Sequence, residues 1–361
     1  MSKKLHNFNA GPSILPKNIF EKASKSILNL NGSGLSILEI SHRSNEFKDI
    51  LSEARELVLN IAKLDSNEYS SLFLQGGAST QFLMVAYNFL YNNAGYINTG
   101  SWSAKAMKEA KLFGNVVELA SSKDKNYNYI PKDYNNISDL DYVHLTTNNT
   151  IYGTQFKYIP NFNQSIIADM SSDIFSRDID YSVFDLFYAG AQKNLGPAGT
   201  TLVVIKKEMI ERIQREVPSM LNYKVHIEKE SSFNTPPVFS IYACLLNLRE
   251  IKSKGLEKIG LENKTKAELL YDEIDNNSCF AGFAENEDRS YMNVTFNLTD
   301  DNNSEMFEKI CKEKGIIGVN GHRSVGGYRA SLFNALKLDS VKVLKDSMKE
   351  LESLINNKWK Y

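Results

Sequence analysis

The chain has 361 residues, 42% of them hydrophobic, which is enough apolar material for a large core shared between two packed units. Its 42 Lys and Arg balance 43 Asp and Glu, and the net charge of -1 argues against nucleic acid or an anionic membrane surface as the main partner. The N-terminal segment lacks the apolar stretch of a signal peptide, and no apolar run approaches the ~18 residues of a membrane span, so we expect a cytoplasmic protein.

Cysteine and histidine are spaced too widely for a metal site or a disulfide framework. The cysteines, Cys244, Cys279 and Cys311, lie far apart and form no C-x-x-C pair. The five histidines also lack metal-ligand spacing. We therefore expect reduced thiols in the core and no bound metal.

Short strand-like runs alternate with amphipathic helical stretches between about residues 70 and 205. This order predicts an α/β fold, with a mainly parallel central sheet flanked by helices. After about residue 257 the rhythm changes and predicts a smaller α+β unit that ends in a helix near 339–357. We assign a large domain to 16–256 and a small domain to 1–15 and 257–361. The expected strands of the large domain are "SSLFLQ", "GYINTG", "NVVELA", "YVHLTT", "SIIADMSS", "FDLFYAG" and "TTLVVIK".

The first of these strands leads into a glycine turn that opens a helix, in "LFLQGGASTQF". Backbone amides at such a helix start, together with the hydroxyls of Ser79 and Thr80, suit a phosphate group. The turn is not a P-loop, since the G-K-[ST] ending is missing, and it is not a G-x-G-x-x-G fingerprint. A turn that binds nothing is the competing interpretation.

Two further strand ends carry Trp102 and Asp169. Ligands bind at the carboxyl ends of strands in open α/β sheets, so both residues are candidates for a site. The ring of Trp102 suits stacking on a flat cofactor, with a core tryptophan as the alternative. Asp169 ends an apolar run, where a buried carboxylate needs a cationic or strongly donating partner. A capping aspartate is the alternative at that position.

The fourth strand end, in "YAGAQKNLGPAGTTLVVI", carries Lys193. Apolar runs lie on both sides of this lysine, and glycines and a proline define a tight backbone path after it. Burial beside a core lowers the pKa of a lysine and makes its amine a nucleophile or Schiff-base former. A solvated loop lysine is the alternative for such a residue taken alone.

Pyridoxal 5'-phosphate explains the four strand ends together. This cofactor needs a lysine for its aldehyde, an acid partner for its pyridine nitrogen, a face for its ring and an anion site for its phosphate. The four strand ends offer one of each: Lys193 for the aldehyde, Asp169 for the ring nitrogen, Trp102 for the ring face and the glycine turn for the phosphate. A phosphate- or nucleotide-binding module without covalent chemistry is the alternative from another class, and it predicts nucleotide affinity in a colourless protein.

Segments spread over nearly the whole chain occur in the order of one known family. They are "FNAGPSILP", "SHRSNEF", "QGGASTQF", "NTGSWSAKA", "ADMSSDIFSRDID", "YAGAQKNLGPAGTTLVVI", "FNTPPVFSIY" and "GHRSVGGYRASLFNA". By these segments the chain resembles the class V, fold-type I pyridoxal-phosphate aminotransferases and, among them, the phosphoserine aminotransferases.

The resemblance implies a role in cofactor binding for each of nine residues. Lys193 forms the Schiff base and later moves the proton between the substrate and the cofactor. Asp169 pairs with the pyridinium nitrogen, and Trp102 stacks on the ring. Asn234 and Thr235 match the pair that reaches the phosphate from the neighbouring subunit, which implies a homodimer with shared active sites. The remaining cofactor contacts implied by the resemblance are Ala78, Ser79, Thr150 and Gln192.

The substrates that the resemblance implies are anions, and the sequence offers cations for them. Arg329 is the expected clamp for the α-carboxylate, and Ala10 lies where the N-terminal segment touches substrate through its backbone. Some family members have an arginine at the position of Ser79, so one anion contact is absent here or comes from elsewhere. Residues that we expect to bind the substrate phosphate or the side-chain carboxylate of glutamate are His42, Arg43, His322 and Arg323.

The expected activity is reversible, ping-pong transamination of 3-phosphohydroxypyruvate with L-glutamate, giving O-phospho-L-serine and 2-oxoglutarate in serine biosynthesis. The related phosphorylated intermediate of pyridoxine biosynthesis is a further possible substrate. Another class V enzyme is the alternative. An alanine-glyoxylate aminotransferase has less need of so many anion-binding residues, and a cysteine desulfurase is disfavoured because no cysteine lies in an evident active-site loop.

Overall fold

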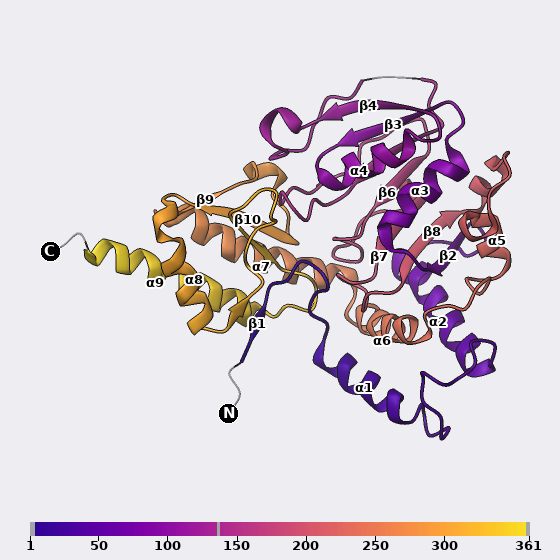
Figure 1. The fold of residues 1–361 in the computed structure, drawn as a ribbon, viewed down its shortest axis with the longest axis horizontal. Coiled ribbons are helices and arrows are strands. Elements are labelled where there is room, and N and C mark those ends of the chain that lie inside the picture. Colours follow the sequence, from indigo (N-terminus) through magenta and orange to yellow (C-terminus); the bar gives the residue numbers. More distant parts are fainter. Residues whose placement is uncertain (1–3, 136–137, 359–361) are drawn as a thin grey trace.

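The computed structural model describes residues 4–135 and 138–358. A seven-stranded sheet in the order β2-β8-β7-β6-β5-β3-β4 forms its centre (Figure 1). The strands from β7 to β4 are parallel, and β8 pairs antiparallel with both of its neighbours. The predicted α/β fold with a mainly parallel sheet is therefore confirmed. The strands are β2 (Tyr69–Leu74), β3 (Asn93–Asn98), β4 (Asn115–Ser121), β5 (Tyr142–Thr146), β6 (Ile166–Asp169), β7 (Leu186–Gly190) and β8 (Thr201–Lys206).

Helices cover both faces of this sheet, because successive strand residues point to opposite sides. In β7, Phe187 packs into a core with helices α1, α2 and α6, whereas Tyr188 packs into a second core with α3 and α4. The strand is buried on both faces, which explains its continuous apolar run. The helices of this unit are α1 (Lys17–Leu28), α2 (Asn45–Ala62), α3 (Gly77–Phe89), α4 (Ser101–Ala110), α5 (Tyr223–Glu228) and α6 (Val238–Lys254).

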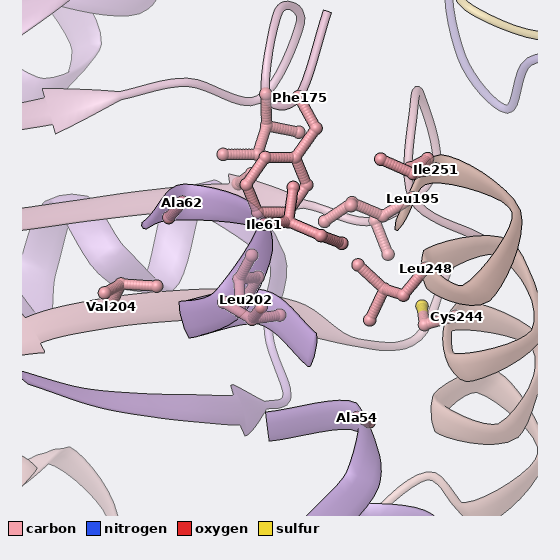
Figure 2. Packing of buried hydrophobic residues seen from close by; sticks show 14 of the residues in the cluster. Ala54, Ile61, Ala62, Phe175, Leu195, Leu202, Val204, Cys244, Leu248 and Ile251 are labelled. Carbon is pink, nitrogen blue, oxygen red and sulfur yellow. The ribbon is translucent and has the colours of Figure 1, made fainter. Parts of the chain in front are cut away.

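The first of the two cores is shown from close by in Figure 2. Leu248 of α6 lies there among side chains from the sheet and from the loops that follow it, including Leu195 and Leu202. Leu248 and Leu202 are fully buried, and Leu195 is 1% exposed. Close packing of this kind holds α6 against the loop that contains Lys193.

A smaller unit follows, with the three-stranded antiparallel sheet β12-β10-β9. The N-terminal strand β1 pairs with β11 of this unit, so in Figure 1 the indigo start of the chain lies beside the orange and yellow elements. The predicted last helix corresponds to α9. The elements are β1 (His6–Asn7), β9 (Phe280–Gly282), β10 (Asn293–Leu298), β11 (Ile316–Ile317), β12 (Tyr328–Ser331), α7 (Leu256–Asn276), α8 (Ser304–Glu313) and α9 (Leu338–Lys358).

Helix α7 belongs to the cores of both units. Leu256 and Ile259 in its first turns pack into the large core. From Ala267 onward its apolar side chains pack into the core of the smaller unit, which also contains Phe8. The proposed domain limit after residue 256 thus falls at the start of a helix that joins the two cores.

Within the described ranges no helix is long and apolar enough to cross a membrane. The same part of the chain holds no group of three His, Cys, Asp or Glu side chains that could bind a metal ion. Cys244, Cys279 and Cys311 are buried and unpaired.

Replacing Leu248 with alanine should lower the free energy of unfolding by about 2–5 kcal/mol, because the truncation leaves a cavity in a closely packed core. Leu261, 67% exposed on α7, offers a matched helical control. Its replacement by alanine should change stability by no more than about 0.5 kcal/mol. Denaturant unfolding checks both values, and equal losses in the two variants would contradict the packing described here.

Candidate active site

A cavity of about 320 Å³ lies at the carboxyl ends of β5, β6 and β7. The starts of α3 and α4 form one part of its wall, and β12 and the N-terminal segment form another. Parallel strands end at one edge of the sheet, so side chains from distant parts of the chain meet there. The lining residues are Ala10, Gly11, Gly77, Ala78, Ser79, Trp102, Thr146, Asn148, Thr150, Ile151, Asp169, Ser171, Ser172, Gln192, Lys193, His322 and Arg329.

Lys193 lies in the turn that follows β7, three residues beyond the end of the strand at Gly190. The strand begins later than the predicted "FDLFYAG", at Leu186, and ends at Gly190 as predicted. The chain then turns at Ala191, whose carbonyl accepts the N–H of Gly196 at 2.8 Å. The Lys193 amine donates a hydrogen bond to the Thr150 hydroxyl at 2.8 Å. Burial lowers the pKa of Lys193 to about 8, although the charge of Asp169 opposes this shift. A substantial fraction of the amine is therefore unprotonated at slightly alkaline pH.

Asp169 is the last residue of β6 and is 5% exposed. Burial raises the pKa of its carboxyl, while the hydrogen bond that its Oδ1 accepts from the Ser171 N–H and the charge of Lys193 act in the opposite direction. A second buried carboxylate, Asp173, lies one turn further along and accepts hydrogen bonds from Thr147 and Gln155. The Asp169 carboxylate thus faces the cavity with hydrogen-bonding capacity that Ser171 does not use up.

The wall at α3 comes from the first helical turn. Gly76, the N-cap, has a φ of 97°, and a Cβ at this position would lie 2.0 Å from the Thr80 hydroxyl. That hydroxyl donates to the Gly76 carbonyl at 2.9 Å, so the turn is compact. The following residues, Ala78 and Ser79, line the cavity at the positive end of the helix dipole.

Trp102 lies in the first turn of α4, whose start is held by Ser103. The Ser103 hydroxyl accepts the N–H groups of Thr99 and Gly100, each at 3.0 Å. On the ring of Trp102 lies the ammonium of Lys105, 4.4 Å from the ring centroid. These contacts hold the indole at the cavity wall.

Arg329 of β12 approaches the same threonine as Lys193. Its Nη1 donates to the Thr150 carbonyl at 3.3 Å, whereas the Thr150 hydroxyl receives the Lys193 amine. Burial lowers the pKa of the Arg329 guanidinium, which nevertheless stays charged at physiological pH. The amine and the guanidinium therefore flank one residue at the cavity wall.

The structure brings ten of the predicted site residues to this cavity and leaves five outside it. His42 and Arg43 lie on the segment between α1 and α2, away from the cavity of their own chain. Asn234 donates to the Gln75 side chain at 2.6 Å, and Gln75 in turn donates to the Thr235 carbonyl. The residues that line the cavity are Ala10, Ala78, Ser79, Trp102, Thr150, Asp169, Gln192, Lys193, His322 and Arg329, and those outside it are His42, Arg43, Asn234, Thr235 and Arg323.

Sequence reasoning missed several polar side chains of the cavity. Thr146 ends β5, a strand that the pattern did predict, so inspection of its carboxyl end would have found this residue. Ser171 lies two residues after Asp169, at the same strand end, and would have been found in the same way. Asn148 carries no local signal, because only the tertiary structure shows that it hydrogen-bonds Ser172 and Asn293.

The residues present fit pyridoxal 5'-phosphate. Three buried polar atoms at the cavity have no hydrogen-bond partner within the described part of the chain: the Trp102 Nε1, the Thr146 hydroxyl and the Arg329 Nε. Buried polar groups are normally paired, so such atoms indicate a polar ligand. The amine of Lys193, the carboxylate of Asp169 and the start of α3 offer what the aldehyde, ring nitrogen and phosphate require.

The protein-family model described as "Aminotransferase class-V" matches residues 5–344. The chain belongs to the class-V aminotransferase family. Its curated relatives include the phosphoserine aminotransferase of Flavobacterium johnsoniae, which is 56% identical over 98% of this chain and 100% of the relative. Another is the phosphoserine aminotransferase of Bacteroides thetaiotaomicron, which is 53% identical over 97% of this chain and 99% of the relative.

Solved structures agree with this family membership. The phosphoserine aminotransferase of Bacillus circulans subsp. alkalophilus superposes with a TM-score of 0.94 at 41% identity, covering 98% of this class-V aminotransferase and 99% of that chain. The PLP-bound phosphoserine aminotransferase of Trichomonas vaginalis superposes with a TM-score of 0.91 at 33% identity, covering 96% of this chain and 100% of that chain. An alanine-glyoxylate aminotransferase from Nostoc sp., at 15% identity and a TM-score of 0.74, shares the fold.

The pKa of Lys193 should respond to the charge of Asp169. In the cofactor-free protein, the pH dependence of Lys193 labelling by an amine-reactive reagent, measured by mass spectrometry, should have a midpoint near 8. Asp169→Asn removes a negative charge that stabilises the ammonium, so the midpoint should move to lower pH. Asp180→Asn, at an exposed aspartate, is the control. A rise in the midpoint for Asp169→Asn would contradict the geometry.

Proposed function

We propose that this class-V aminotransferase binds pyridoxal 5'-phosphate and exchanges the amino group of L-glutamate with the keto group of 3-phosphohydroxypyruvate, giving 2-oxoglutarate and O-phospho-L-serine. The observation that carries the proposal is the meeting of Lys193 and Arg329 at Thr150. An α-amino acid has its amine and its carboxylate on one carbon. Lys193 and Arg329, which both contact Thr150, are therefore close enough together for one to react at the amine and the other to bind the carboxylate of the same amino acid.

Lys193 is the group that moves protons in the proposed reaction. Its lowered pKa would let the neutral amine take the proton from the substrate α-carbon, and the ammonium so formed would pass this proton to the bound cofactor within the same half-reaction. In the other half-reaction Lys193 would move a proton in the opposite direction. In the cofactor-free protein the amine donates a hydrogen bond to the Thr150 hydroxyl. Bound pyridoxal 5'-phosphate supplies the electron sink for the carbanion that proton removal leaves.

Asp169, Trp102 and the start of α3 are proposed to hold the cofactor. The Asp169 carboxylate would pair with the protonated ring nitrogen, and this pairing offsets the cost of burying its charge. The indole of Trp102 would cover the ring, and the amides of Ala78 and Ser79 would bind the phosphate. Thr150 and Gln192, both at the cavity, would complete the contacts.

Arg329 is proposed to bind the substrate α-carboxylate, next to Ala10 of the N-terminal segment. Burial lowers the pKa of His322, and so do the charges of Arg329, Arg323 and Lys105. Positive charge therefore gathers at the side of the cavity where His322 lies. This charge supports phosphoserine and glutamate as substrates, since the distal group of each is an anion. It disfavours alanine, whose side chain carries none.

We also propose a cytoplasmic homodimer with shared active sites. Asn234 and Thr235 lie outside the cavity of their own chain, as do His42 and Arg43, which is the arrangement expected of residues that act in a neighbouring subunit. Large apolar side chains are exposed near these segments, including Leu35 at 50%, Leu38 at 62% and Phe233 at 40%. A second copy of the chain would cover such surface.

The near-visible absorption of the purified protein tests the reaction. The cofactor band should appear and should be bleached by L-glutamate and by O-phosphoserine, each added to a separate sample. Lys193→Ala should lower turnover by a factor of about 10²–10⁴, because it removes the proton-transfer group. Lys108→Ala, at an exposed lysine of α4, should leave turnover unchanged. A band that phosphoserine leaves unaltered would reject the substrate, and near-normal turnover of Lys193→Ala would reject the mechanism.

Mixed dimers test the sharing of sites. Lys193→Ala chains and Asn234→Ala chains, co-expressed with different tags, should form a heterodimer with one site that carries both changes and one that carries neither. The intact site should bind the cofactor with native affinity, about half the total sites being active. If Asn234 acts within its own chain, the active site of the heterodimer will instead show the weakened affinity of the Asn234→Ala homodimer.

A further inference from the structure

A set of buried and half-buried asparagines lies behind Lys193 and joins the two units of the fold. Asn194 follows Lys193 directly and is 3% exposed. Its Nδ2 donates to the Ile174 carbonyl at 3.2 Å, and its Oδ1 accepts the backbone N–H of Asn334 at 3.1 Å. Ile174 lies in the loop that follows Asp169, and Asn334 lies in the loop that follows Arg329. The Asn194 side chain therefore contacts both the loop after Asp169 and the loop after Arg329.

Asn334 also contacts the large unit through its own side chain. Its Nδ2 donates to the Phe175 carbonyl at 2.9 Å, and its Oδ1 accepts from Asn263 of α7 at 2.8 Å. Asn263, which is 2% exposed, donates to the Ser176 carbonyl as well. Asn334 is thus bonded through backbone and side chain at once, so the loop 332–336 has a single register against the Lys193 turn.

A buried lysine holds the loop of Asn334 from the other side. Lys266 of α7 donates to the carbonyls of Leu332, Phe333 and Leu336 at 2.7, 2.9 and 3.1 Å. An ammonium has three donors, and these three carbonyls use them all. The loop that presents Asn334 is consequently fixed along its length.

The Lys193 turn is held in the same manner. Asn247 of α6 donates to the carbonyls of Asn194 and Leu195 at 2.7 and 2.9 Å. Ser13 of the N-terminal segment donates its N–H to the Gln192 carbonyl and its hydroxyl to the Lys193 carbonyl. The backbone around Lys193 therefore has little freedom. Two contacts come from the unit of Arg329, one from Ser13 of the N-terminal segment and one from Asn334, and of the two Asn334 lies in the loop that directly follows the Arg329 strand.

We infer that Asn334 is a positioning residue for Lys193, acting through Asn194 to set the place of the reactive amine relative to the Arg329 strand. The inference rests on the proposed role of Lys193 as the reacting amine. Proton transfer requires the amine and the bound carboxylate to keep a defined separation, and a displacement of about 1 Å can lower a rate by 10²-fold. Apolar side chains packed between the two loops would let one loop slide against the other. Paired amides instead hold the two loops in one register.

The test is Asn334→Ala, compared with Asn277→Ala. Asn334 is half-buried and Asn277 is a buried asparagine of the smaller unit. The Asn277 Nδ2 donates to Glu273 and its Oδ1 accepts the Cys279 N–H, but Asn277 lies at the end of α7. Asn334→Ala keeps the backbone N–H that binds Asn194 but removes the side-chain bonds that fix the loop presenting it. In the full-length, cofactor-free protein the pH midpoint of Lys193 labelling should therefore move upward from about 8, because a looser turn admits water to the amine. In the holoenzyme, kcat should fall roughly 10- to 100-fold with KM changed less than about threefold.

The control should change neither the labelling midpoint nor kcat. If Asn334→Ala does not fold, Asn263→Ala removes one bond to the Asn334 side chain and should give a smaller shift in the same direction. An unchanged midpoint in the folded variant, or equal changes in Asn277→Ala, would overturn the inference. The labelling step uses no substrate, so an error in the proposed substrates would leave its outcome intact.

Discussion

The site depends on two opposite charges that the fold removes from water, the carboxylate of Asp169 and the amine of Lys193. Burial alone drives both groups toward their neutral forms, raising one pKa and lowering the other. Each partly offsets the shift of the other through its charge. The protonation of the amine and that of the carboxylate therefore depend on one shared environment at one edge of the sheet.

The positions of these residues in the chain were predictable because they lie beside regular structure. Apolar runs mark β5, β6 and β7, and the polar residues that follow such runs meet at one edge of a parallel sheet. Asp169 and Trp102 were found by this argument. The turn of Lys193 was found through its glycines, although the strand before it was predicted too long.

Other features depend on contacts that no local pattern records. The reversed direction of β8 follows from a short connection through the Lys193 turn, and the placement of Asn334 against Asn194 joins residues 140 positions apart. An asparagine in a loop predicts only a turn, and its role emerges when two loops pack together. The five predicted residues outside the cavity show the same limit, since a motif names a residue without stating where the fold places it.

The register of β1 has a consequence for the order in which the molecule can be completed during synthesis. His6 pairs with Ile316, so the first strand leaves the ribosome about three hundred residues before its partner exists. Ala10 and Gly11, which line the cavity, belong to that early segment. The large sheet can form while translation continues, whereas the N-terminal wall of the site must wait for the smaller unit. A nascent chain stalled before β11 would hold a folded sheet and an unfinished pocket.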